Sequence, residues 1–268
     1  IFGMSLALLN VRSFPYLVFL SLPAVMVNFG QIKIKWFKRI LLLVTCVLLF
    51  IESFFYLNGN YYQFSDSQYQ VGLKYSESSK SALDFVLNNN LPGPIFNNFD
   101  IGSYIIYRGY PKYRVFIDGR PEAYPASFIQ GIYVPAQYDY EKFKVLNQET
   151  GFKTVIFSHT DQTPWAANFL KEVIKDLSWS LVYVDDYMVV LVRSEDLDKY
   201  NLQKVELASL NPNNFDFNNH VSYIRLAIFL ANSGNTEAAG KFISKSLKIF
   251  PQSPVANSAI EKPTKSYI

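Results

Sequence analysis

The stretch ILLLVTCVLLFIESFFYL, residues 40–57, decides how the rest of this sequence is interpreted. It is almost wholly apolar over about 18 residues, and a helix of roughly 20 such residues crosses the ~30 Å hydrocarbon core of a bilayer. A helix on the surface of a soluble domain carries a polar face, whereas here Glu52 and Ser53 are the exceptions. Glu52 lies within two turns of the C-terminal end, within reach of the headgroups. The stretch therefore predicts a transmembrane helix.

A second apolar stretch, SFPYLVFLSLPAVMVNF at 13–29, precedes it. Its two prolines are tolerated in a membrane helix when neighbouring groups satisfy the freed carbonyls. The connecting sequence QIKIKWFKR, residues 31–39, carries four Lys and Arg residues. The positive-inside rule makes this loop cytoplasmic. We therefore predict transmembrane helices within 1–57, the lipid bilayer as a partner, and an extracytoplasmic location for everything after about residue 58.

Composition excludes several classes of protein. The chain has 268 residues, of which 50% are hydrophobic and 18% charged, so it does not resemble a disordered chain. A net charge of +3 without a dense basic run argues against nucleic-acid binding. Cys46 is the single cysteine, and the two histidines lack metal-ligand spacing, so we predict no disulfide, no metal site and no cofactor. Because the first residue is Ile1, we expect a piece of a longer protein.

Residues 58–76 are polar and tyrosine-rich and predict a juxtamembrane linker. Residues 77–195 then alternate between strand and helix patterns. Strands are predicted at 94–98, at 113–118 as a central strand, at 152–158, and in a closing hairpin of 179–186 and 187–193. Helical patterns separate them. This order predicts a small three-layer α/β domain whose mixed sheet is mostly parallel, with an antiparallel edge.

The C-terminal region, 196–268, has a helical pattern. Residues 220–253 match a tetratricopeptide repeat of about 34 residues, with small residues at Ala227 and Ala239 and a helix-ending Pro251. One interpretation is a lone helical hairpin packed on 196–212 or on the α/β domain. The other is the start of a truncated peptide-binding array. The final stretch, EKPTKSYI, predicts a disordered end.

Polar residues gather where the predicted strands end, which is where open α/β sheets bind ligands. Asn98 follows one strand, Asp118 and Arg120 end the next, and His159 follows a third. Asp118 and Arg120 suit a turn with a structural ion pair, a ligand or catalytic site, or a contact to the membrane part. His159 suits a loop or capping residue better than a general base. The sequence contains no GxSxG, Walker, HExxH or GxGxxG motif.

The order of parts, with one local pattern, carries a resemblance. The pattern is N-x-x-x-G-x-Y, a short helix, Pro, and V-F-I-D-G-R-x-x-x-Y. Its residues here are Asn98, Gly102, Tyr104, Pro111, Val115 to Arg120, and Tyr124. Over about residues 10–195 the chain resembles the C-terminal part of the bacterial multi-spanning glycosyltransferase-like proteins of the GT-C class, which use polyprenyl-phosphate-linked sugars.

The resemblance implies an accessory portion of such a protein in the bacterial cytoplasmic membrane. Its α/β domain would cap the membrane active site or help to bind the acceptor, while the catalytic acidic residue would lie outside this chain. The expected ligand-binding residues are Asn98, Asp118, Arg120 and Tyr124, with Arg12 as a contact for lipid phosphate. The alternative is a membrane-anchored interaction module that binds a protein or peptide through the helical hairpin, without sugar chemistry.

Overall fold

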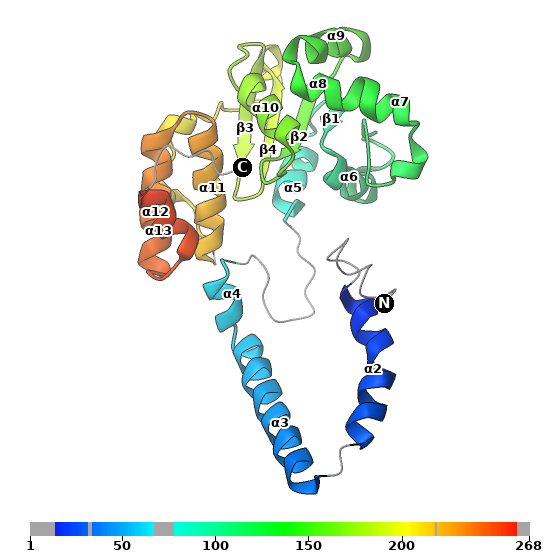
Figure 1. The fold of residues 1–268 in the computed structure, drawn as a ribbon. Helices are drawn as coiled ribbons and strands as arrows, with labels where there is room; N and C mark the ends of the chain where they lie inside the picture. The colour runs from blue at the N-terminus through cyan, green and yellow to red at the C-terminus, as the bar shows by residue number, and fades with distance from the viewer. Residues whose placement is uncertain (1–13, 32–33, 67–77, 218, 262–268) are drawn as a thin grey trace. The chain divides into compact units, whose positions relative to one another are not determined.

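The structure is a computed structural model that describes residues 14–31, 34–66, 78–217 and 219–261. Its contacts divide the chain into two compact units, Ile1–Asn60 and Tyr61–Ile268 (Figure 1). The first unit contains the apolar N-terminal helices. The second contains the sheet and all later helices.

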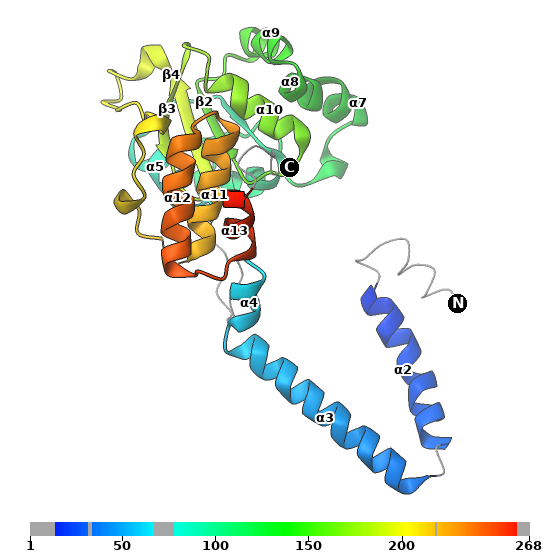
Figure 2. The same ribbon diagram turned by 60° about the vertical axis from the view of Figure 1, so that its left-hand side comes forward.

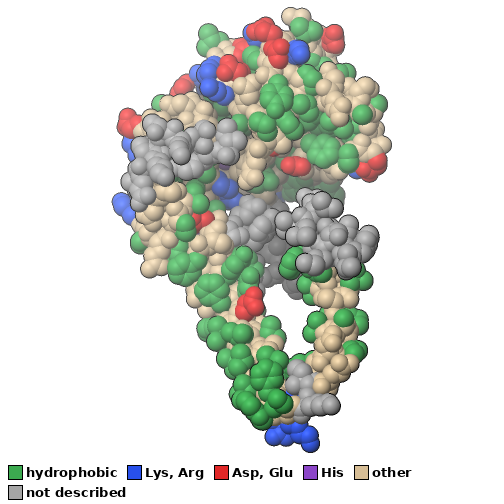
Figure 3. Space-filling view, viewed as in Figure 1, with side chains coloured by type: hydrophobic (Ala, Val, Ile, Leu, Met, Phe, Trp, Pro, Cys, Tyr) green, Lys and Arg blue, Asp and Glu red, His purple; other side chains and the backbone are tan. Residues whose placement is uncertain are grey.

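The described residues of the N-terminal unit form two helices, α2 (Phe14–Gln31) and α3 (Lys35–Leu57). Both are long and apolar enough to cross a membrane, and none of their residues is buried within the protein. Hydrophobic side chains follow both helices (Figure 3). The two predicted apolar helices are therefore confirmed as helices. The helix predicted at 40–57 begins earlier, at Lys35, because the end of the basic loop forms its first turn.

The predicted linker is described as far as Asp66, and this part is ordered. It contains the short helix α4 (Asn60–Phe64), and its last described residue is Asp66. The Asp66 carboxylate accepts hydrogen bonds from the Ser253 hydroxyl at 3.0 Å and the Val255 backbone N–H at 2.8 Å, and lies 2.8 Å from Nε2 of His220. A carboxylate at a helix N-terminus satisfies N–H groups that lack partners within the helix. Asp66 therefore links the start of the second unit, Tyr61–Ile268, to its C-terminal helices.

Four short strands form the sheet, in the order β1-β2-β4-β3. They are β1 (Ile95–Asn97), β2 (Thr154–Ser158), β3 (Trp179–Val184) and β4 (Met188–Arg193). β1 pairs with β2 in parallel, while β2 with β4 and β3 with β4 are antiparallel. The mixed sheet and its closing hairpin are confirmed. The prediction that the sheet is mostly parallel is wrong, because one of the three strand pairs is parallel.

The predicted central strand at 113–118 is also wrong. This run forms no strand, and part of its backbone bonds to a side chain instead of a neighbouring strand. Oδ1 of Asn97 accepts from the Phe116 N–H at 3.0 Å, and Nδ2 of Asn97 donates to the Ile117 carbonyl at 2.7 Å. One amide thereby satisfies two backbone groups that a strand would pair through its ladder. The β-branched and aromatic composition of this run reflects burial, as at Tyr113 and Ile117.

The helical segments between the strands are confirmed, and several have clear local causes. Asp139 caps α9 by accepting from the Glu141 N–H at 3.1 Å, Gly151 ends it in the left-handed conformation, and Pro164 occupies the first turn of α10. The helical elements of this region are α5 (Lys80–Asn88), η2 (Phe99–Ile101), α6 (Gly102–Gly109), η3 (Pro121–Ala123), α7 (Ala126–Phe128), the π-helical η4 (Ile129–Tyr133), α8 (Val134–Tyr138), α9 (Tyr140–Thr150) and α10 (Pro164–Val173).

Alternate strand residues enter two different buried clusters, as expected when successive side chains point to opposite faces. Phe96, Val155 and Phe157 pack in a cluster that also contains residues of α8, α9, α10, α11 and α12. Ile95 and Ile156 pack in a second cluster with residues of α5 and α6. Both faces of the sheet therefore contribute to the core.

The C-terminal region is helical, as predicted. Three short 3₁₀ turns, η5 (Ser194–Asp196), η6 (Leu207–Ser209) and η7 (Pro212–Asn214), lead to α11 (His220–Asn232), α12 (Thr236–Ile249) and α13 (Pro254–Glu261). Gly234, with φ +83°, turns the chain between α11 and α12, and Figure 2 shows the three helices next to one another. The predicted disordered end, 262–268, lies outside the described residues.

Candidate functional site

The most tightly bonded polar group among the predicted site residues is formed by Asp118, Arg120 and Tyr124. The guanidinium of Arg120 binds the Asp118 carboxylate through Nε at 2.8 Å and Nη2 at 2.8 Å, and the Arg120 backbone N–H adds a third bond at 3.1 Å. The Tyr124 hydroxyl accepts from the Asp118 N–H and donates to its Oδ2, both at 3.0 Å. These three predicted residues therefore form one unit at the end of the 113–118 run.

The two charges in this unit differ in exposure. The side chain of Asp118 is 2% exposed, whereas that of Arg120 is 62% exposed. Hydrogen bonds from Arg120, helped by the Tyr124 hydroxyl, lower the pKa of Asp118 to about 2 despite its burial. The Asp118 carboxylate in turn raises the pKa of Arg120. The ion pair therefore stays charged at neutral pH, and Asp118 is unsuited to act as a general acid or base there.

Arg120 keeps donors for a ligand. A guanidinium carries five N–H groups, and Asp118 takes one from Nε and one from Nη2. Among the described residues, none accepts from the other three N–H groups, and the exposed side chain is oriented by the buried carboxylate. Such a group can bind a phosphate or carboxylate oxygen. The Asp118–Arg120 pair has no net charge. We therefore expect an anionic ligand to be bound mainly by the oriented N–H groups of Arg120 and less by long-range attraction.

Asn98 belongs to a different group, at the shared end of β1 and β2. Its Oδ1 accepts from the Ser158 N–H at 3.1 Å, and its Nδ2 donates to Oδ2 of Asp161 at 3.4 Å. Burial raises the pKa of the neighbouring Asp100, and the charge of Asp161 adds to the effect. Asn98 itself is fully buried and acts here as a connector between the strands. Arg12, the fifth predicted site residue, lies outside the described residues.

A cavity of about 560 Å³ lies beyond the end of β2 and includes Asp161 in its wall. Sequence reasoning missed the residues that reach it from distant parts of the chain, such as Asp66, Arg225 and Asn232. They come from the segment after α4 and from α11, and no local pattern marks them. The guanidinium of Arg225 is bound to the Asp186 carboxylate, and its Nη2 lies 3.0 Å from the Ser222 hydroxyl. This cavity therefore combines paired charges with polar side chains.

His159 also lines this cavity but is held as a packing residue. Its ring stacks on Phe229 at 4.7 Å between centroids, and its Nε2 lies 2.9 Å from the Asp185 carbonyl. Because a carbonyl only accepts, Nε2 carries the proton. Burial lowers the pKa of His159 to about 4, so the ring is neutral at pH 7. His159 is therefore placed between the sheet and α11, and not in an exposed loop.

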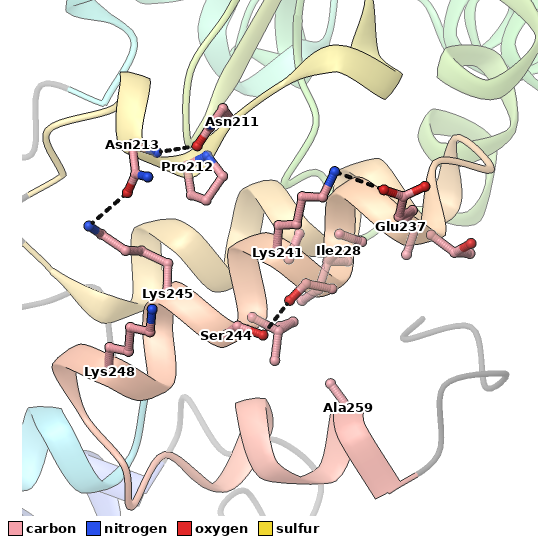
Figure 4. A pocket seen from close by; sticks show the side chains of 16 residues that line it. Asn211, Pro212, Asn213, Ile228, Glu237, Lys241, Ser244, Lys245, Lys248 and Ala259 are labelled. Atoms are coloured by element: carbon pink, nitrogen blue, oxygen red, sulfur yellow. Dashed lines mark hydrogen bonds and ion pairs between the residues drawn. The ribbon is translucent and has the colours of Figure 1, made fainter.

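A larger hollow, with a volume of about 740 Å³, lies along the surface of the C-terminal helices (Figure 4). Residues of η7, α11, α12 and the end of α13 line it. Three of them are lysines of α12, namely Lys241, Lys245 and Lys248. We call this hollow the α12 groove.

Within the described ranges, no group of three His, Cys, Asp or Glu side chains could hold a metal ion. No family model, curated protein or solved structure matches this chain. The described residues form a small mixed α/β domain with a helical C-terminal region, preceded by two apolar helices.

Proposed function

We propose that this chain is the C-terminal accessory portion of a membrane glycosyltransferase-like protein of the bacterial cytoplasmic membrane. In this proposal α2 and α3 span the bilayer, and the part after about residue 58 is an extracytoplasmic, three-layer α/β domain with its helical extension. The domain caps a membrane active site or helps to bind the acceptor. The catalytic acidic residue belongs to a part of the protein outside this chain.

The observation that carries the proposal is the exposed guanidinium of Arg120, oriented by the buried carboxylate of Asp118. A sugar carried on a polyprenyl phosphate presents its phosphate at the membrane surface, and arginine matches the geometry of phosphate oxygens. The domain also has a short tether, since nine positions separate Leu57, the end of α3, from Asp66. Arg120 is thus proposed to bind lipid-linked phosphate, with Arg12 as a second contact.

The test uses the whole chain in nanodiscs and a short prenyl phosphate, farnesyl phosphate, as the probe. Binding is followed by the ³¹P line width, with farnesol in a competition experiment to separate the phosphate from the apolar tail. Hydrogen bonds between charged groups are stronger than those between neutral groups, and exposure to water weakens them. We therefore expect Arg120→Ala to weaken binding about tenfold, and Arg120→Lys to weaken it less.

The matched control is Arg114→Ala, which removes an exposed arginine from the same segment. Equal binding by Arg120→Ala and Arg114→Ala, or equal binding of farnesol and farnesyl phosphate, would contradict the proposed role of Arg120. The upstream reading frame decides between the two functions. Eight or more further spans, with Asp or Glu in the first outer loop, favour the glycosyltransferase-like protein, and a direct start before Ile1 favours the interaction module.

A further inference from the structure

The α12 groove has the dimensions of a site for a helix. Its volume is about 740 Å³, and its lining runs along α12 from Thr236 to Lys248. At 1.5 Å per residue this is a length of about 18 Å, or three to four helical turns. Part of the lining is apolar: Ile228, Ala231 and Ala259 are partly exposed, while Ala227 and Ala239 lie buried behind them in the core. Small side chains allow a second helix to approach closely.

The lining of the α12 groove carries more positive than negative side chains. Lys241 is paired with Glu237 at 2.8 Å, and Glu237 is the single acidic residue in the lining. Lys245 donates to the neutral Oδ1 of Asn213 at 3.2 Å. Among the described residues, neither Lys245 nor Lys248 has a carboxylate partner. Figure 4 shows both side chains extending from α12, with Lys245 reaching toward Asn213. Two positive charges beside an apolar surface favour an acidic occupant.

We propose that the α12 groove binds an acidic amphipathic helix of a partner protein. The apolar face of that helix packs on the partly exposed Ile228, Ala231 and Ala259. Its carboxylates bind Lys245 and Lys248, which lie three positions apart on α12. This is the helix-in-groove mode of recognition, with charge selecting the partner. The inference is independent of the role proposed for Arg120, because the two surfaces share no residue.

The chain's own last residues fit this charge pattern poorly. Residues 262–268 contain Lys262 and Lys265 and no acidic residue. Like charges would face one another if this stretch occupied the groove. An acidic partner is the better match.

The experiment uses the whole chain in nanodiscs of zwitterionic lipid. The probe is a fluorescein-labelled, 18-residue amphipathic peptide of Ala, Leu and Glu, and its twin carries Lys in place of every Glu. Fluorescence anisotropy should show binding of the acidic peptide, weakening as salt rises from 50 to 300 mM, and at least tenfold weaker binding of the basic twin. Lys245→Glu with Lys248→Glu should weaken binding of the acidic peptide at least tenfold.

Gly240→Leu blocks the groove without using charge. A Cβ added at Gly240 meets nothing within 4 Å, so the new side chain projects into open space, and leucine is the better helix former. We expect unchanged or higher thermal stability and at least a tenfold loss of peptide binding. The matched control for the lysine pair is Lys142→Glu with Lys171→Glu, two exposed lysines on α9 and α10.

Each of the following outcomes would overturn the proposal. The two peptides could bind equally, or the acidic peptide could fail to bind. Gly240→Leu could bind as the parent does, or the control pair could lose binding as strongly as Lys245→Glu with Lys248→Glu. Finally, the acidic peptide could fail while vesicles containing phosphatidylglycerol, or a second copy of the chain, bind in a way that depends on Lys245 and Lys248.

Discussion

The substitution Asp118→Asn tests whether the Asp118–Arg120–Tyr124 unit holds the domain together. It keeps the shape of the side chain and removes its charge. In the parent protein, donors of Arg120 and Tyr124 bind both oxygens of the Asp118 carboxylate. The amide of the variant has one acceptor oxygen, and its NH₂ group would face some of these donors. The substitution would remove charge-assisted hydrogen bonds at a buried position and bring donor groups to face one another, which is costly. We therefore expect the variant to fold with a lower free energy of unfolding.

The magnitude follows from the pKa of Asp118, which falls from its usual 3.8 to about 2 in the folded protein. Each pKa unit corresponds to about 1.4 kcal/mol, so the ionised carboxylate contributes about 2 kcal/mol at pH 7. Because the folded pKa is the lower one, this contribution is fully present above pH 3.8. It is lost as the pH falls through about 2. For a folded unit of this size, 2 kcal/mol lowers the Tm by about 4–8 °C.

The assay is thermal unfolding of the whole chain in nanodiscs, followed by the fluorescence of its three tryptophans, of which Trp179 is buried. Asp118→Asn should lower the Tm at pH 7, and the difference from the parent should shrink between pH 4 and pH 2. Asp198→Asn, at an exposed position, is the control. Unchanged melting by Asp118→Asn at pH 7, together with lost prenyl-phosphate binding, would refute the structural role and leave Asp118 as a residue that positions Arg120.

Two further predictions concern packing and topology. Gly102→Ala should lower the Tm strongly, because the new Cβ would lie 2.0 Å from the Ile117 carbonyl oxygen, and overpacking of this kind costs about 1–3 kcal/mol or more. Gly131→Ala, with open space around the added Cβ, should leave the Tm nearly unchanged in the same melting experiment. Gln130→Cys should react with a membrane-impermeant thiol reagent in intact cells at a level above the parent protein. Labelling that appears only after lysis would show that the domain faces the cytoplasm.

The strands that sequence patterns predicted correctly are those with nearby partners or uniform burial. The β3–β4 hairpin is an example, because its two runs flank Asp185 and Asp186, and its register depends on residues close in sequence. The run at 113–118 has the same strand-like composition, yet it meets a side chain, Asn97, and not a strand. Composition reports burial and extension, but the partner of each backbone group is set by distant residues.

In the candidate site, too, the residues that are close in sequence could be grouped from the sequence, and the contacts between distant residues could not. Asp118, Arg120 and Tyr124 lie within seven residues, so a local motif was enough to group them. Asn98 was also predicted, but its partner Ser158 lies 60 residues away, and the pairing depends on the parallel alignment of β1 and β2. The cavity beyond β2 needs α11 as well, and nothing in the local sequence of Arg225 indicates that it lines this cavity.

Three of the residues that carry the resemblance have a structural reason for their identity. Gly102 allows α6 to approach the carbonyl of Ile117, Asn98 joins β1 to β2, and Tyr124 bridges the backbone and carboxylate of Asp118. A fold can require such a pattern without any substrate, since function resides in sites added to folds. Within the part of the chain that the structure describes, the three remaining N–H groups of Arg120 make no hydrogen bond that the fold requires. The proposed phosphate binding therefore depends on that guanidinium, and it fails if Arg120→Ala binds prenyl phosphate as well as the parent does.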